Sequence, residues 1–440
     1  MKIGFISLGC SKNLVDTEWM MGSLKGSGHV VVNRERDADV IVINTCGFIG
    51  DAREEAIDTI LETARWKDKG ALRVLIAAGC LVQNHANELM TEIPELDGVI
   101  GVHAIDRLVS VIDRCLAGNR VREVPDDGPL PYSSPGERLI ATGAGWAYLK
   151  IAEGCSNRCT YCAIPGIRGG LRSRGIEEIT EEAAQLAENG VRELIVIAQD
   201  TTAYGTDLGM TDGLAALLSR LNRIDALAWI RVMYVYPASI TPAILDALTL
   251  SKVVPYLDIP VQHASEAVLR KMGRRYSGEE LRRIIAQLRE RIPGLTLRTT
   301  LMTGFPGETE ADHQENVALL DEIRFDWAGV FSYSPEPGTP AAALPGPVSD
   351  AVKQNRLDQL MMLQKSITAD INRSRIGTTH WVLVESPAGA DTEEARAWFQ
   401  APEVDGHIRL TGARQFPPGS LIQARITAAA DYDLKAVPVL

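Results

Sequence analysis

The first 125 residues alternate short apolar runs with stretches of helical period, the pattern of βαβ units around a parallel sheet. We predict strands at Lys2–Leu8, Val40–Asn44 and Arg73–Ala78, and shorter strands near Val30 and Val99. Residues 1–125 are therefore expected to form an N-terminal α/β domain.

From residue 141 to 374 the same alternation continues over a longer span. The predicted strands are Trp146–Ile151, Glu193–Ala198, Trp229–Tyr236, Tyr256–Val261, Leu295–Thr303 and Trp327–Tyr333. Six such units predict an open, partial (β/α)6 barrel as the second domain. In this architecture the polar, glycine-rich segments after the strands gather at one end, where barrel active sites are assembled.

Helix signals lie between these strands. Thr180, followed by two glutamates, marks a predicted helix start, and Gly190 marks its end. Ser277 and Glu280 have the spacing of a capping box. Two helix positions in the barrel are thus predicted from local signals.

The last part of the chain changes period. A helix is predicted from about Asp350 to Arg373, and β-rich segments follow at Trp381–Glu385, His407–Leu410 and Leu421–Ile426, separated by Pro and Gly turns. Residues 375–440 therefore predict a small antiparallel β-barrel. The Pro- and Gly-rich stretch 126–140 is interpreted as a linker between the first two domains.

The composition is that of an ordinary globular protein, with 45% apolar and 23% charged residues among 440. No membrane span and no signal peptide are recognisable, so a cytoplasmic location is expected. The formal net charge of −12 disfavours nonspecific binding of nucleic acid and suits a basic partner. Seven cysteines, an odd number in such a chain, favour metal or catalytic thiols over a disulfide framework.

Three of these cysteines lie within eight residues, at Cys155, Cys159 and Cys162, with CxxxCxxC spacing. Thiolates select zinc, copper or iron-sulfur clusters, and a structural zinc site needs four closed ligands. No fourth Cys or His lies nearby in sequence, so a [4Fe-4S] cluster with one open iron is the preferred interpretation. A zinc loop or three buried thiols are the alternatives.

Three more cysteines each follow a predicted strand directly: Cys10, Cys46 and Cys80. The carboxyl ends of parallel strands share one edge of the sheet, so these thiols are expected to converge into a second three-thiolate cluster. Separate burial of the three is the alternative. Cys115 lies on a helical pattern without a glycine turn, so we interpret it as a core residue.

The CxxxCxxC loop resembles the signature of the radical S-adenosylmethionine (SAM) enzymes, in which the open iron binds SAM. In view of that resemblance, Arg168 is a candidate for the SAM carboxylate, together with Gln199 and Gln262, which follow predicted strands. With Arg172 and Arg174, the segment around Arg168 could hold the SAM carboxylate or an acidic substrate group, and a solvated face for these arginines is the alternative. His263 is expected to be a structural histidine.

With three cysteines ahead of this loop and a small β-barrel behind it, the whole chain resembles a methylthiotransferase. The resemblance implies an auxiliary [4Fe-4S] cluster on Cys10, Cys46 and Cys80, a SAM-binding [4Fe-4S] cluster on Cys155, Cys159 and Cys162, and a substrate-binding TRAM domain at the C-terminus. It also implies that SAM cleavage yields a radical that removes hydrogen from the substrate, with sulfur and methyl added afterwards.

The family has a tRNA branch and a RimO branch, which thiomethylates the β-carbon of an aspartate in ribosomal protein S-twelve. The segments 401–406 and 430–434 resemble the RimO branch, whereas 398–400 departs from its pattern. Acidic residues outnumber basic ones by three over 377–440, and we interpret Glu403 and Asp405 as part of an acidic face for a basic protein. The alternative is that the two residues only shape a turn, because Asp405-Gly406 is a turn signal.

The implied partners are ribosomal protein S-twelve, an electron donor such as flavodoxin or ferredoxin, and a sulfur donor that the sequence does not identify. Two rival interpretations remain. One is a tRNA adenosine methylthiotransferase, and the other is a noncatalytic iron-sulfur carrier.

Overall fold

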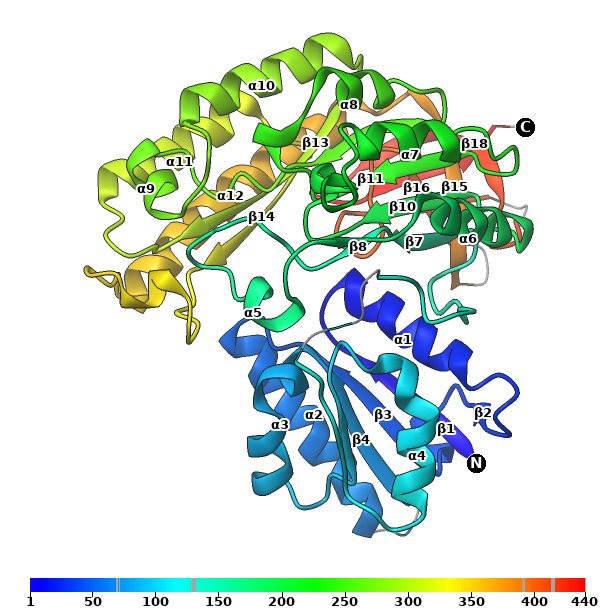
Figure 1. The fold of residues 1–440 in the computed structure, drawn as a ribbon. Coiled ribbons are helices and arrows are strands. Elements are labelled where there is room, and N and C mark those ends of the chain that lie inside the picture. Colours follow the sequence, from blue (N-terminus) through cyan, green and yellow to red (C-terminus); the bar gives the residue numbers. More distant parts are fainter. Residues whose placement is uncertain are drawn as a thin grey trace.

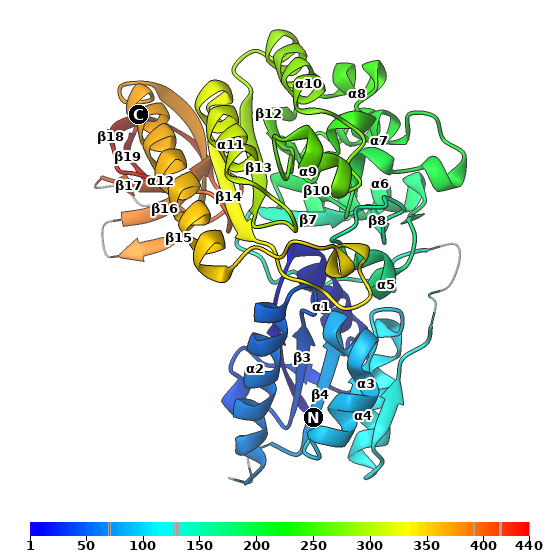
Figure 2. The same ribbon diagram turned by 90° about the vertical axis from the view of Figure 1, so that its left-hand side faces the viewer.

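Three bodies of secondary structure follow one another along the chain in the computed structural model (Figure 1). The structure describes residues 1–68, 70, 72–126, 128, 132–389, 392–412 and 416–439. The N-terminal body lies below the central one in Figures 1 and 2, and the C-terminal body packs behind the central sheet. Among the described residues, no helix is long and apolar enough to cross a membrane.

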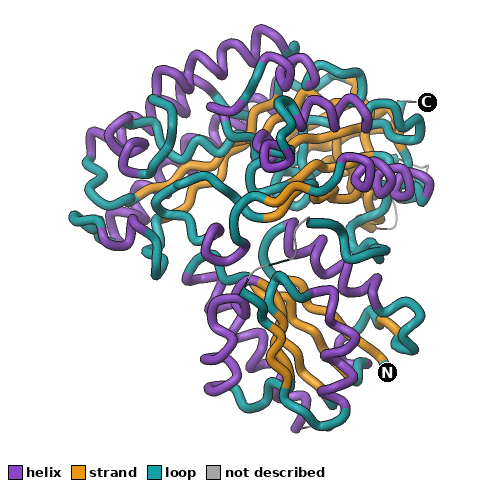
Figure 3. Tube along the Cα trace, viewed as in Figure 1, coloured by secondary structure: helices purple, strands orange, loops and turns teal. Residues whose placement is uncertain are grey.

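The N-terminal body is a parallel sheet between helices, as predicted. Its strands are β1 (Lys2–Ser7), β2 (Val30–Val31), β3 (Val40–Thr45), β4 (Val74–Gly79), β5 (Gly98–Ile100) and β6 (Val121–Glu123), in the order β2-β1-β3-β4-β5-β6. Its helices are α1 (Ser11–Ser23), α2 (Gly50–Asp68), α3 (Cys80–Glu92) and α4 (Leu108–Leu116). All residues of β3 and β4 are buried, because α2 and α3 cover one face and α1 and α4 the other (Figure 3).

The central body is an open sheet of six parallel strands, also as predicted. The strands are β7 (Trp146–Lys150), β10 (Glu193–Ile197), β11 (Trp229–Val232), β12 (Val253–Asp258), β13 (Thr296–Thr303) and β14 (Trp327–Ser332), in the order β14-β13-β12-β11-β10-β7. A small hairpin joins β8 (Ala152–Glu153) to β9 (Arg172–Ser173). The helices are α5 (Ile164–Arg168), α6 (Ile176–Glu188), α7 (Gly213–Leu221), α8 (Pro242–Ala247), α9 (Glu266–Lys271), α10 (Gly278–Arg291), α11 (Glu310–Ile323) and α12 (Asp350–Ser374).

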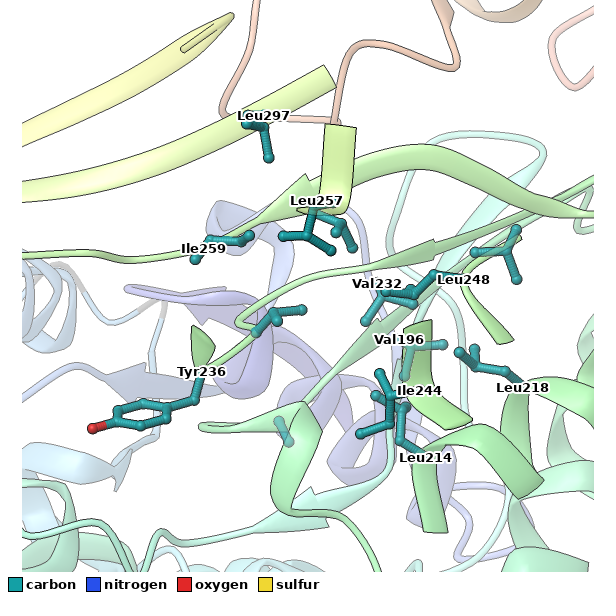
Figure 4. Close-up of a cluster of buried hydrophobic side chains, with 14 of the residues drawn as sticks. Val196, Leu214, Leu218, Val232, Tyr236, Ile244, Leu248, Leu257, Ile259 and Leu297 are labelled. Carbon is teal, nitrogen blue, oxygen red and sulfur yellow. The ribbon is translucent and has the colours of Figure 1, made fainter. Parts of the chain in front are cut away.

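The outer face of this sheet packs against the helices through a core of branched apolar side chains. Figure 4 shows the strand residues Val196 and Val232 close to Leu218 of α7 and to Ile244 and Leu248, and Leu257 next to Ile259. Each labelled residue in the figure is at most 6% exposed. Burying such a side chain contributes about 1.5–3 kcal/mol, so this core holds the helices against the strands.

Three local predictions in this body were imprecise or wrong. Strand β11 ends at Val232 rather than Tyr236, because Tyr234 has φ +60°, which a strand does not accommodate. Strand β12 lies at Val253–Asp258, three residues earlier than predicted. Helix α6 begins at Ile176, and Thr180 lies inside it, where its hydroxyl donates to the Ile176 carbonyl. The capping box of Ser277 and Glu280 on α10 is confirmed.

The C-terminal body is a closed barrel of β15 (Thr379–Gly389), β16 (Thr392–Ala397), β17 (Ile408–Thr411), β18 (Leu421–Ala429) and β19 (Leu434–Pro438). Strands β16 and β19 were not predicted. The barrel has its own small core, which includes Val382, Phe399 and Ile426. The predicted helix before it is confirmed as α12.

The barrel closes the inner face of the central sheet, and this corrects the interpretation of Asp405 as part of an acidic docking face. Glu403 is exposed and lies in a turn, in agreement with the alternative that these residues shape a turn. Asp405 has a buried side chain that accepts from Tyr256 Oη at 2.7 Å and lies 3.5 Å from Arg298 Nε. Glu403 accepts from Tyr148 Oη at 2.8 Å. Both carboxyls therefore face strands of the central sheet.

The segment 398–400 that departs from the family pattern lies at the same contact. The carbonyls of Trp398 and Phe399 accept from Arg231 and from Trp327 Nε1, at 2.8 and 2.9 Å. Arg396 joins this contact through an ion pair with Glu193 at 2.8 Å. This part of the barrel serves the junction with the central sheet.

The predicted linker 126–140 lies partly outside the described residues, at 127 and 129–131. Its described part is tied to both neighbouring bodies. Arg138 forms ion pairs with Glu18 of α1 and with Glu182 of α6, and all three side chains are largely buried. These contacts hold the first two bodies against each other.

Candidate active site

The carboxyl ends of the N-terminal and central strands face one another, and a cavity of about 340 Å³ lies between them. It is lined by all six predicted cluster cysteines: Cys10, Cys46, Cys80, Cys155, Cys159 and Cys162. Helices α1 and α5 lie at this junction in Figures 1 and 2. Two sets of thiols from different bodies thus share one cavity.

The first set, here called the sheet set, comprises Cys10, Cys46 and Cys80. These residues follow β1, β3 and β4, which are neighbours in the sheet, so their thiols converge at its edge. Gly9, at φ +87°, allows this approach because a Cβ there would lie 2.7 Å from Cys46 Cβ. The predicted convergence at the sheet edge is therefore explained by strand order.

The second set, here called the loop set, comprises Cys155, Cys159 and Cys162. Its loop is fixed by backbone hydrogen bonds: Cys155 N donates to Gly169 O at 3.1 Å, and Thr160 N donates to Met272 O at 2.9 Å. Each thiol is partly exposed. The loop therefore presents three thiols to the cavity without a regular element beneath them.

Burial disfavours the thiolate form of Cys80 and Cys162 in the absence of a bound cation. Burial raises the pKa of Cys80 to about 12 and that of Cys162 to about 12. In the described residues, no group of three His, Cys, Asp or Glu side chains is arranged to hold one metal ion. A [4Fe-4S] cube has a different requirement, because each thiolate binds its own iron, and three thiols around a cavity fit it.

Arg168, predicted to bind the SAM carboxylate, lines the cavity but bonds within the protein. It donates to Glu153 at 2.7 Å and to Asp16 at 3.0 Å, and its Nε lies 3.3 Å from Cys80 Sγ. It also donates to Asn13 Oδ1 at 2.5 Å. Arg168 thus reaches from the central body to the sheet set, and its role toward SAM stays a prediction.

Arg172 and Arg174 lie away from solvent, so the alternative of a solvated face is wrong. Arg174 is fully buried and pairs with Glu178 and Glu182 at 2.8 and 2.6 Å. Arg172 is 8% exposed, with its guanidinium 5.3 Å from the ring centroid of Tyr132. Neither lines the cavity of the six cysteines.

Gln199 and Gln262 both line the cavity. Gln199 Nε2 donates to Glu153 at 2.9 Å, and its Oε1 has no hydrogen-bond partner in the described structure. Gln262 adopts φ +69°, an uncommon value for a residue with a side chain. His263 is buried and its Nδ1 accepts from Ser265 N at 3.0 Å, in agreement with the structural role expected of it.

Several cavity residues were not predicted, among them Lys12, Tyr234 and Arg274. Asn13, which contacts Arg168 and Cys80, was not predicted either. Lys12 and Asn13 lie two and three residues after Cys10, so their position after a strand end was the available signal. Tyr234 was hidden inside a predicted strand, and its φ of +60° has no sequence signature. Arg274 lies far from the cysteines in sequence, yet its Nη1 is 3.7 Å from Cys159 Sγ.

Lys12 and Arg274 are the cavity cations that have no carboxylate within ion-pair distance in the described chain. Arg274 donates hydrogen bonds to Tyr276 Oη at 2.8 Å and to Pro260 O at 2.5 Å. Lys12 is 5% exposed, and its Nζ lies 2.8 Å from the ring centroid of Tyr234. Burial lowers the pKa of Lys12 to about 7, against the attraction of Cys10 and Asp258.

The three bodies match three family descriptions. Residues 149–320 match the radical SAM superfamily, and residues 376–439 match the TRAM domain. Residues 2–101 match a family described as uncharacterized protein family UPF0004. The division of the chain into three bodies is thus visible in the family matches as well.

Similar proteins cover the full length of the chain. A protein of Syntrophomonas wolfei named ribosomal protein uS12 methylthiotransferase RimO is 48% identical over 435 residues, which is 99% of both chains. A protein of the same name from Pelotomaculum thermopropionicum is 46% identical over 443 residues, covering 100% of both. The radical SAM methyltransferase TsrM of Kitasatospora setae shares the fold, with a TM-score of 0.57 at 14% identity over 77% of this chain and 73% of that one.

Proposed function

This chain belongs to the RimO family of radical SAM methylthiotransferases, and we propose that it adds a methylthio group to the β-carbon of an aspartate in ribosomal protein uS12 of the small subunit. The observation that carries the proposal is the single cavity lined by both three-thiol sets. A reaction that needs a radical and a sulfur atom at one carbon requires both sources within reach of the same substrate.

The cofactors are two [4Fe-4S] clusters and SAM. In the proposal, the sheet set holds the auxiliary cluster, the loop set holds the SAM-binding cluster, and Arg168, Gln199 and Gln262 contribute to SAM binding. We assign the domains to residues 1–125, 141–374 and 375–440, with a linker at 126–140 between the first two. The assignment of the thiols to clusters is supported by their position at the ends of parallel strands, where α/β proteins bind ligands.

When bound, the clusters and SAM supply the one-electron chemistry, the sulfur and the methyl group. The chain's own residues position the reactants and exclude water. Glu153 is fixed by Lys150 and Arg168 at 2.8 and 2.7 Å, and it orients Gln199 toward the cavity. The cations Lys12 and Arg274 lie at the sheet set and at the loop set, respectively, next to the negative charge of thiolates.

The partners follow from this activity. The formal charge of −12 suits a basic ribosomal protein, and a ribosomal substrate places the enzyme in the cytoplasm. An electron donor such as flavodoxin or ferredoxin is required for the radical step, and a sulfur donor must restore the auxiliary cluster. The C-terminal TRAM domain contributes to substrate binding through surfaces other than its contact with the central sheet.

The direct test is mass spectrometry of small-subunit ribosomal proteins from cells with and without this enzyme. We expect uS12 to carry a methylthio group on one aspartate only when the enzyme is present. A strain with Cys155, Cys159 and Cys162 replaced by Ala is the matched control and should lack the modification. Thiomethylated tRNA with unmodified uS12 would instead assign the chain to the tRNA branch.

A further inference from the structure

Lys12 has a buried amino group without an ion-pair partner in the described structure. It lies in the first turn of α1, two residues after the sheet set's Cys10, and its Nζ contacts the ring of Tyr234 in the central body. A buried charge is costly unless it is paired, and an ammonium offers three hydrogen-bond donors. A ligand that brings an anion to this corner would offset that cost.

Two further features make the same corner suited to an anion. Helix α1 begins at Ser11 with no side-chain cap, so the first N–H groups of a 13-residue helix have no side-chain acceptor. Arg168, the other nearby cation, is already paired with Glu153 and Asp16. The basic group at this corner that is still open to an anion is therefore Lys12.

The opposite wall is held in a strained conformation. Tyr234 has φ +60°, and it is fixed by Asp258, which accepts from its N–H at 3.2 Å, and by Thr201, which donates to its carbonyl at 3.2 Å. Strained backbone of this kind persists where the surroundings over-determine it, and it clusters at ligand sites. The contact of Lys12 with this ring thus belongs to a preorganised wall.

From this geometry we propose that Lys12 binds the side-chain carboxylate of the substrate aspartate. The inference rests on the proposed function. The carboxylate is bonded to the β-carbon that reacts, so a cation that holds it also places that carbon between the two thiol sets. A site built around an ammonium also rejects asparagine, because the neutral amide leaves the buried charge unpaired.

The test uses the anaerobically reconstituted holoenzyme and two peptides of the ribosomal protein, one with the target aspartate and one with asparagine at that position. Their dissociation constants are measured by fluorescence anisotropy for the wild type and for Lys12→Met, which keeps the length of the side chain. Lys25→Met is the matched control, because Lys25 is exposed and pairs only with exposed Glu137.

We expect the wild type and Lys25→Met to bind the aspartate peptide about tenfold or more tightly than the asparagine peptide, the effect of one charged hydrogen-bonded contact. Lys12→Met should bind the two peptides about equally, with unchanged iron content and SAM affinity. The rival role for Lys12 is to balance the charge of the auxiliary cluster.

Equal binding of both peptides by the wild type would overturn the proposal, as would an unchanged preference in Lys12→Met. Loss of about half the iron in Lys12→Met, or loss of SAM affinity, would assign Lys12 to a cofactor instead. Failure of the proposed function is a separate outcome, since it appears as a wild type that leaves the aspartate peptide unmodified in the presence of SAM and reductant.

Discussion

The sheet set and the loop set each present three thiols to one cavity but are built differently. The loop set lies within eight residues and is held by hydrogen bonds of its own backbone and of the turn after α9. The sheet set spans 71 residues and exists only because β1, β3 and β4 are neighbours. A local sequence specifies the first set, whereas the order of strands specifies the second.

The two sets also differ in what surrounds them. The sheet set is completed by the other body, because Arg168 of the central body contacts Cys80 and pairs with Asp16 of α1. The loop set contacts the central body's own Arg274. Disturbing the junction between bodies should therefore affect the sheet set first.

The largest expected effect comes from removing one set at a time. Replacing the three loop-set cysteines by Ala should reduce SAM cleavage to background, because no thiolate remains to hold the SAM-binding cluster. Replacing the three sheet-set cysteines should spare cleavage but stop methylthio transfer. The measurement is 5'-deoxyadenosine together with modified uS12, and robust cleavage without the loop set would reverse the assignment.

Arg168→Gln tests the dependence on the junction. The change leaves Glu153 and Asp16 buried with one cation fewer, which costs about 3–5 kcal/mol for a broken buried pair. We expect a lower melting temperature and a selective loss of iron from the sheet set, seen by iron analysis and spectroscopy. Arg270→Gln, at an exposed position, is the control. Equal loss of iron from both sets in Arg168→Gln would contradict the expectation that the sheet set depends more on the junction.

Asp405→Asn tests whether the C-terminal barrel supports both sets alike. Burial raises the pKa of Asp405 to about 6, above its value in an unfolded chain, so the folded state binds the extra proton. Its contribution to stability is therefore lost as pH rises through about 6, by up to about 1.4 kcal/mol per pH unit.

The melting temperature of the wild type relative to Asp405→Asn should accordingly fall between about pH 4 and pH 6, the interval between the unfolded and folded pKa values. Iron in both sets should stay unchanged, because the contacts of Asp405 are with Tyr256, Arg298 and the Ala401 N–H and not with a cysteine of either set. A pH-independent difference in melting temperature would contradict the buried position of this carboxyl.

The smallest effect is expected at the seventh cysteine. Cys115 is buried in the N-terminal core, and its thiol donates to Asp97 O at 3.3 Å. Cys115→Ala should cost about 1 kcal/mol through lost packing and one weak hydrogen bond, measured by thermal unfolding. Iron content should not change, so a loss of iron would show that Cys115 belongs with the other thiols.

The same contrast explains what could be predicted from the sequence. Strand and helix periods predicted the parallel sheets and the barrel. The CxxxCxxC spacing predicted the loop set, and cysteines placed after strands predicted the sheet set. The contacts of Arg168 with Asp16 and Asn13 could not be predicted, because they join residues more than 150 positions apart through the docking of two bodies. Burial of Asp405 was missed for the same reason, since only the docked barrel removes that carboxyl from water.

Iron analysis of the anaerobically reconstituted chain tests the central claim most directly, namely that two three-thiol sets in one cavity each hold a [4Fe-4S] cluster. We expect about eight irons per chain in the wild type and about four after either set is replaced by Ala. About four irons in the wild type, unchanged when the sheet set is replaced, would contradict it.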